Sequence, residues 1–197
     1  MIAVLALVAA VWTIVLFRRG GLVTACLLVL AAGVCFGPFF FHQSVGPVQV
    51  SIDRVLWGLL LVYYAIARVT GGTVQRPLTR ADLFLGAFYL VVVANVVAFD
   101  YSHADSRPLS QLLFYHLLPI GVYWVARHSA YTIHTVLGML VALALFGVYL
   151  GFTAVAETHG LSSLVYPRYI ASAENVEFLG RARGPLMNPA GAGVMLG

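Results

Sequence analysis

Long runs of apolar residues, separated by short polar connections, recur along this chain. A helix needs about 20 apolar residues to cross a hydrocarbon core of about 30 Å, and most of these runs approach that length. We therefore expect six complete membrane spans, at about residues 2–17, 22–41, 55–69, 83–99, 109–126 and 135–156. A seventh run, 187–197, has about half the length of a crossing. The 197 residues are thus expected to form one transmembrane domain, the N-terminal part of a longer protein.

The runs are continuous, whereas barrel strands would alternate apolar and polar residues over about ten positions. Glycine and proline stand in the connections, where helices should begin or end. Arg18 and Arg19 follow the first run rather than precede it, which favours a span over a cleavable signal peptide. The predicted fold class is an all-α, polytopic bundle of transmembrane helices.

The composition agrees with a lipid environment, because 61% of the residues are hydrophobic and only 9% are charged. A water-soluble domain carries about a quarter of charged residues, so that class is excluded. All 11 basic residues are arginines, and they are dispersed, which excludes nucleic acid as a partner despite the net charge of +4. Arginines favour the connections after the first, third and fifth runs, which places these on the cytoplasmic side and the long loop 157–186 outside.

The most distinctive local feature is the string RARGPLMNPAGAG at positions 181–193. Arg181 and Arg183 precede a turn at Gly184, and Asn188 followed by Pro189 is typical of a helix start. Two guanidinium groups beside a helix N-terminus can bind phosphate oxygens through paired donors. The alternative is structural: the arginines reach the membrane interface or pair with two acidic residues of the loop, Glu174 and Glu177.

Other polar residues give weaker signals. His116 lies near the middle of the fifth run, where an ionisable group suggests an intramembrane functional site or a hydrogen bond to a neighbouring helix. The loop between the fourth and fifth runs brings three possible metal ligands close together in sequence, Asp100, His103 and Asp105. We interpret them as solvated loop residues rather than as a metal site. Cys26 and Cys35 stand nine positions apart in one run and cannot bridge each other within a helix.

The string at 181–193, after a polar outer loop and before a new span, resembles the O-antigen ligase and polymerase family of bacterial membrane glycan transferases. Members carry an Arg, then Gly-Pro or Gly-Thr, then an Asn-Pro helix start. The resemblance covers about a dozen residues, supported by the six preceding runs. Leu186 departs from the pattern where an aromatic residue is common, and Ala190 replaces a frequent second Asn.

The resemblance implies a multi-pass protein of the bacterial inner membrane with a GT-C-like fold. It also implies transfer of a glycan from a polyprenyl-diphosphate carrier to a hydroxyl of a glycan or lipid acceptor, with no metal and no other cofactor. On this basis Arg183, with Arg181 as a weaker partner, is assigned to the diphosphate. The general base is expected beyond Gly197 and remains unknown. Alternatives are a transporter or flippase of lipid-linked substrates, or a non-catalytic membrane subunit.

Overall fold

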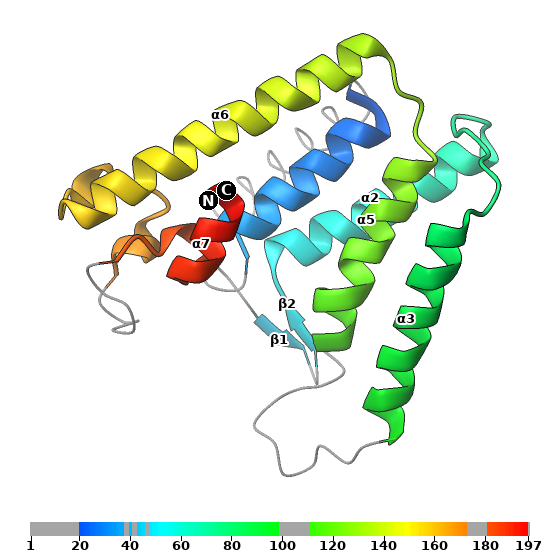
Figure 1. The fold of residues 1–197 in the computed structure, drawn as a ribbon, viewed down its shortest axis with the longest axis horizontal. Coiled ribbons are helices and arrows are strands. Elements are labelled where there is room, and N and C mark those ends of the chain that lie inside the picture. Colours follow the sequence, from blue (N-terminus) through cyan, green and yellow to red (C-terminus); the bar gives the residue numbers. More distant parts are fainter. Residues whose placement is uncertain are drawn as a thin grey trace.

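The computed structural model describes residues 20–37, 40, 43–45, 48–98, 111–172 and 181–196. Helices make up most of this part of the chain (Figure 1). An unlabelled helix, Gly20–Cys35, comes first. It is followed by α2 (Ile52–Val69), α3 (Arg80–Ala98), a π-helical stretch (Leu112–Leu117), α5 (Leu118–Arg127), α6 (Ile133–Thr158) and α7 (Pro189–Leu196). Short 3₁₀ turns lie at Ser162–Leu164, Arg168–Ala171 and Gly184–Leu186.

A small hairpin precedes α2. Its strands, β1 (Gln43–Val45) and β2 (Val48–Val50), are antiparallel, with Gln43 opposite Val50 and Val45 opposite Val48. These are the only strands in the described residues, so the hairpin is a local connection rather than a sheet that organises the fold.

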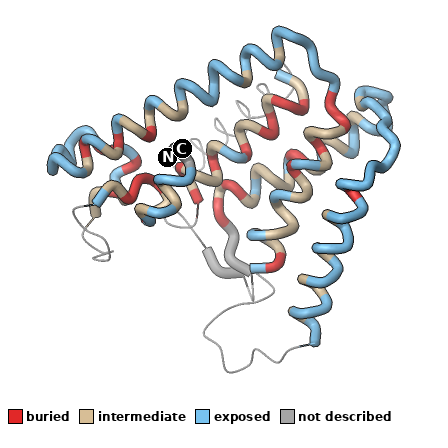
Figure 2. Tube along the Cα trace, viewed as in Figure 1, coloured by how far each residue is buried: buried red, intermediate tan, exposed pale blue. Residues whose placement is uncertain are grey.

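The main core lies where three helices meet. The helix Gly20–Cys35 contributes four buried residues, and α2 and α5 contribute the others; the cluster consists of Leu22, Ala25, Cys26, Val29, Leu60, Val122 and Val125. Small side chains let the helices approach, and Gly121 of α5 faces the indole of Trp57 on α2, where an added Cβ would lie 2.8 Å from Nε1. The buried positions follow the facing sides of these helices (Figure 2).

Two helices are long and apolar enough to cross a membrane among the residues that the structure describes: α3 with 19 residues and α6 with 26. Few of their residues are buried: 6% over the most apolar 18 residues of α3 and 17% over those of α6 (Figure 2). Single exposed apolar residues are ordinary on soluble proteins, but whole apolar helices left uncovered are not. The expected spans 83–99 and 135–156 therefore correspond to helices that could cross a membrane.

The expectation of six complete spans and the start of a seventh is wrong for the described chain. The helix expected at 22–41 already ends at Cys35, which leaves it too short for the hydrocarbon core. The helix expected at 55–69 is present as α2, but it begins at Ile52. It therefore includes Asp53 and Arg54 besides Arg68. Three charges in 18 residues make a crossing costly.

The remaining expected spans differ for local reasons. At 109–126 a π-helical stretch interrupts the helix, and α5 has only 10 residues. At 187–197 the structure has α7, with eight residues. The expected span 2–17 lies outside the described residues. The observed architecture is a small helical core with two long apolar helices at its edges.

Candidate functional site

Glu157, in the last turn of α6, forms the centre of the site that the sequence places at 181–189. One carboxylate oxygen, Oε1, accepts from Nε of Arg183 at 2.9 Å. The other, Oε2, accepts from the backbone N–H groups of Arg183 at 2.8 Å and Gly184 at 3.0 Å. The carboxylate therefore holds both the side chain and the backbone of the Arg-Gly step, and we call these three residues the Glu157 clamp.

Arg183 is an interior residue. Its guanidinium also donates from Nη2 to the carbonyl of Ile170 at 2.7 Å, and only 1% of the residue is exposed. A buried guanidinium is stable only when it is paired with an opposite charge and its N–H groups are hydrogen-bonded. Glu157 supplies the opposite charge and accepts from Nε, and Ile170 accepts from Nη2. Arg181, two positions earlier, is exposed. The two predicted arginines thus have different environments, and Arg183 pairs with Glu157, an acidic residue that the sequence does not single out as its partner.

Tyr169 ties the loop to the rest of the molecule. Its hydroxyl lies 3.1 Å from the carbonyl oxygen of Cys35 and 2.8 Å from that of Pro185. The contact joins the end of the helix Gly20–Cys35 to the turn that follows Arg183.

The predicted helix start lies directly after this turn. Pro189 is the first residue of α7. The side-chain oxygen of Asn188 accepts from the backbone N–H of Ala190 at 2.9 Å, which is the usual arrangement of an N-cap. Gly184 has a φ of +57°, a backbone conformation that residues with a side chain adopt at a cost. It is also buried, and a Cβ added there would lie 3.6 Å from the Cβ of Ala192. Gly184, Asn188 and Pro189 therefore shape the chain between Arg183 and α7.

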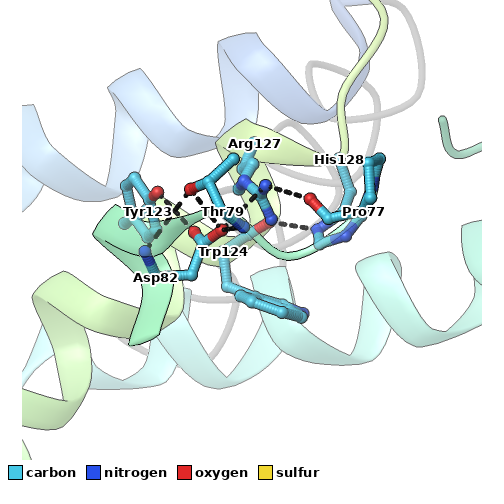
Figure 3. Close-up of polar contacts among 7 residues, drawn as sticks. All are labelled: Pro77, Thr79, Asp82, Tyr123, Trp124, Arg127 and His128. Carbon is cyan, nitrogen blue, oxygen red and sulfur yellow. Dashed lines mark hydrogen bonds and ion pairs between the residues drawn. The ribbon is translucent and has the colours of Figure 1, made fainter. Parts of the chain in front are cut away.

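A second polar cluster joins the first turn of α3 to the last turn of α5 (Figure 3). The carboxylate of Asp82 forms an ion pair with Arg127, with Nη2 and Oδ2 2.8 Å apart. It also accepts from the backbone N–H and hydroxyl of Thr79 and, at 2.7 Å, from the hydroxyl of Tyr123. The Asp82 carboxylate and four donor groups, from Arg127, Thr79 and Tyr123, thus meet at the end of a helix that is otherwise almost uncovered.

The surroundings of this cluster keep Arg127 in place. Its Nη2 donates to the carbonyl of Pro77 at 2.6 Å, and its guanidinium carbon lies 6.0 Å from the centre of the Trp124 ring. The carboxylate of Asp82 raises the pKa of Tyr123, because it accepts a hydrogen bond from the neutral hydroxyl. Sequence reasoning counted Asp82 and Arg127 only as loop charges. The signal it could have used is the N-cap pattern of Thr79 followed three residues later by an acid.

His116 lies in the π-helical stretch rather than in a regular span. Its ring meets the edge of Phe88 on α3, with centroids 6.3 Å apart. Short π-helical insertions often occur at functional sites, so the structure gives His116 a local setting that hydropathy alone does not reveal. Five acidic or imidazole groups named from the sequence lie outside the described residues: Asp100, His103, Asp105, Glu174 and Glu177.

Comparisons with known proteins give no identification. No family model, no curated protein and no solved structure matches this chain. The site must therefore be interpreted from its own chemistry.

The polar groups of the described residues come together mainly as ion pairs. No group of three or more His, Cys, Asp or Glu side chains comes together in them. The Glu157 clamp combines a fixed guanidinium with two oriented backbone N–H groups, and Arg168 and Arg181 are exposed in the same loop. The clamp donors already bind the Glu157 carboxylate, so the exposed arginines Arg168 and Arg181 are the cations of this loop that solvent anions can reach.

Proposed function

We propose that this chain belongs to a membrane enzyme that moves a glycan from a polyprenyl-diphosphate carrier to an acceptor hydroxyl. The supporting observation is that the Glu157 clamp folds the string at 181–189 into one unit at the end of α6, a helix that could cross a membrane. A lipid-linked diphosphate would lie at this level, where the lipid chain meets water. The resemblance supplies the reaction class, and a bacterial inner membrane is proposed on the same ground.

The two arginines have separate roles in this proposal. Arg181 is exposed, so its forked donors are accessible to a diphosphate without rearrangement. Arg183 contacts Glu157 and Ile170 in the folded loop, so it reaches the diphosphate only if the phosphate displaces one of these acceptors. We assign Arg181 to direct contact and Arg183 to holding the loop in register. The general base is not among the residues assigned here.

The test is a transfer assay on the full-length protein in lipid nanodiscs, with a polyprenyl-diphosphate oligosaccharide as donor and a hydroxyl acceptor. Arg181→Ala should raise the KM for the donor by roughly tenfold or more, as expected for one lost charge-assisted contact. Arg183→Lys keeps the charge but loses the fork, and should lower kcat. Arg76→Ala, an exposed arginine in the connection before α3, is the control and should change neither constant. Full activity in both Arg181→Ala and Arg183→Lys would contradict the assignment.

A non-catalytic membrane subunit is the second candidate, and one observation favours it. The burial of Arg183 and its pairing with Glu157 are what a purely structural ion pair would show. The two functions differ in ligand binding: the enzyme should bind polyprenyl diphosphate more tightly than the corresponding polyprenol, whereas a structural subunit should bind both equally. Native mass spectrometry of the protein with each lipid distinguishes them.

A further inference from the structure

The chain after α6 turns back along the helix that it has just left. Gly160, with a φ of +69°, donates its backbone N–H to the carbonyl of Glu157 at 3.2 Å, and Leu161 donates to Ala156 at 2.9 Å. This pair of hydrogen bonds is the Schellman motif, which ends a helix and reverses the chain. The following residues lie beside the C-terminal part of α6 (Figure 1). We call residues 161–170 the return segment.

Two contacts show how far the return segment descends. Val165 and Ile170 pack against Ala156, close to the end of α6. Further along, the hydroxyl of Tyr149 donates to the carbonyl of Tyr166 at 2.7 Å. Tyr149 precedes Thr158, the last residue of α6, by nine positions, which corresponds to about 13 Å along the helix axis. Tyr166 thus lies beside a residue well inside the helix.

This level falls within the hydrocarbon if α6 crosses the membrane. The 26 residues of α6 span about 39 Å, against about 30 Å of hydrocarbon. At most about 9 Å of the helix can project from one side, and tilt reduces that surplus further. The Cα of Tyr149, at about 13 Å from the end, therefore lies at least about 4 Å inside the boundary, and the Tyr149 hydroxyl holds the carbonyl of Tyr166 close to that boundary.

The return segment has two faces. Val165 and Ile170 are buried, with 1% and 0% exposure. Leu161, Leu164 and Tyr166 are exposed by 49%, 53% and 59%. These three side chains are apolar or amphipathic, whereas Ser162, Ser163 and Arg168 are exposed polar residues of the same segment. Apolar residues of α6 are also exposed. A lipid leaflet would cover the exposed apolar side chains of the return segment and those of α6 together, so that neither needs a protein partner of its own.

The backbone of the return segment is also suited to a place without water. Six of its ten carbonyl oxygens accept hydrogen bonds from within the molecule: the 3₁₀ turns use those of Leu161, Ser162, Pro167 and Tyr169, and side chains reach those of Ser162, Tyr166 and Ile170. Irregular backbone is tolerated at membrane depth only when its polar groups are satisfied in this way.

We propose that residues 161–170 form a re-entrant segment, with Leu164 and Tyr166 in contact with the lipid chains of the leaflet on the Glu157 side. Arg168, whose Nη1 donates to the carbonyl of Ser162 at 3.0 Å, stays near the point where the chain leaves α6 and faces the lipid head groups. The proposal rests on α6 crossing the membrane and does not depend on glycan transfer.

Nitroxide labels on the full-length protein in phosphatidylglycerol–phosphatidylethanolamine vesicles test this proposal. Single cysteines are introduced by Leu164→Cys and Tyr166→Cys, with the buried Cys26 and Cys35 replaced by Ala. Leu145→Cys, exposed in the middle of α6, provides the membrane reference, and Gln75→Cys, in the exposed connection before α3, provides the aqueous one. Collision rates with oxygen and with a nickel chelate are measured by electron paramagnetic resonance.

Labels at 164 and 166 are expected to resemble Leu145→Cys, with frequent collisions with oxygen and few with the nickel chelate. Collision rates like those of Gln75→Cys would overturn the proposal, because the segment would then lie in water. Labels that are shielded from both reagents would also overturn it, because protein rather than lipid would cover the patch. Normal transfer activity with either of these results would leave the proposed function intact and remove only the re-entrant segment.

Discussion

At the level of single residues, Glu157 and Arg183 illustrate what a buried ion pair does in a short loop. The desolvation of two charges is costly, and such a pair is retained for the arrangement it enforces rather than for a large net gain in stability. Here the carboxylate uses both oxygens on one dipeptide step, so it sets the direction in which the chain leaves the loop. Removing one partner leaves the other buried without compensation.

Glu157→Gln should lower the free energy of unfolding by about 3 kcal/mol, because the amide cannot accept from all three donors and Arg183 loses its counter-charge. Guanidinium chloride unfolding in detergent, followed by circular dichroism, measures this change. Arg181→Ala is the matched control and should stay within about 0.5 kcal/mol, since the side chain is exposed. Equal stability of Glu157→Gln and the unaltered protein would show that the pair is dispensable.

Asp82 has a comparable role at the first turn of α3. Asp82→Asn removes the ion pair with Arg127 and leaves Thr79 and Tyr123 to compete for one acceptor. Hydrogen exchange at the amides of the first turn of α3 should become roughly tenfold faster, as expected when a local opening becomes easier. Tyr123→Phe removes one hydrogen bond and should have a smaller effect. The reverse order would show that the Tyr123 contact, and not the ion pair, holds the helix.

At the level of elements, the sequence predicts well where hydropathy alone decides. The runs 83–99 and 135–156 lie within α3 and α6 to a few residues at each end. It fails where local chemistry competes with hydropathy: the apolar run 55–69 continues backward into Asp53 and Arg54, and the run 109–126 contains a π-helical stretch. An apolar run shows neither that its helix begins at charged residues before the run nor that its hydrogen bonds are π-helical.

The candidate site shows the same limit. The residues Gly184, Asn188 and Pro189 are recognisable because turns and helix starts depend on neighbouring positions. The partner of Arg183 is 26 positions away, and it is reached only because the chain reverses after α6. Glu174 and Glu177 are closer to Arg183 in sequence, so spacing alone does not point to Glu157.

The contact between α2 and α5 gives a prediction at this level. Gly121→Ala places a Cβ 2.8 Å from Nε1 of Trp57, so the indole or a helix must shift. Overpacking of this kind typically costs about 1–3 kcal/mol. Gly138→Ala on α6 is the matched control, because nothing lies within 4 Å of its Cβ. The thermal midpoint in detergent should fall for the first variant only, and an equal midpoint for both would show that the two helices are loosely packed.

At the level of the whole molecule, polar groups gather at two ends. The connections before α3 and before α6 lie together, because the backbone N–H of Val74 donates to the carbonyl of His128 at 2.8 Å and Arg76 lies 5.9 Å from the ring centre of Tyr131. This end carries Arg80 and Arg127 as well. The Glu157 clamp lies at the C-terminal end of α6. If α6 crosses a membrane, we expect from the positive-inside rule that the end with Arg76, Arg80 and Arg127, which we call the arginine-rich end, faces the cytoplasm.

The central claim is that α6 crosses the membrane and carries the Glu157 clamp to the side opposite the arginine-rich end. Single cysteines from Gln75→Cys and His159→Cys, in a Cys26→Ala, Cys35→Ala background in intact cells, test it with a membrane-impermeant maleimide. The account predicts that the cysteine at position 159 is labelled in intact cells and that the cysteine at position 75 is labelled only after permeabilisation. Labelling of both cysteines in intact cells, or of neither before permeabilisation, would contradict it.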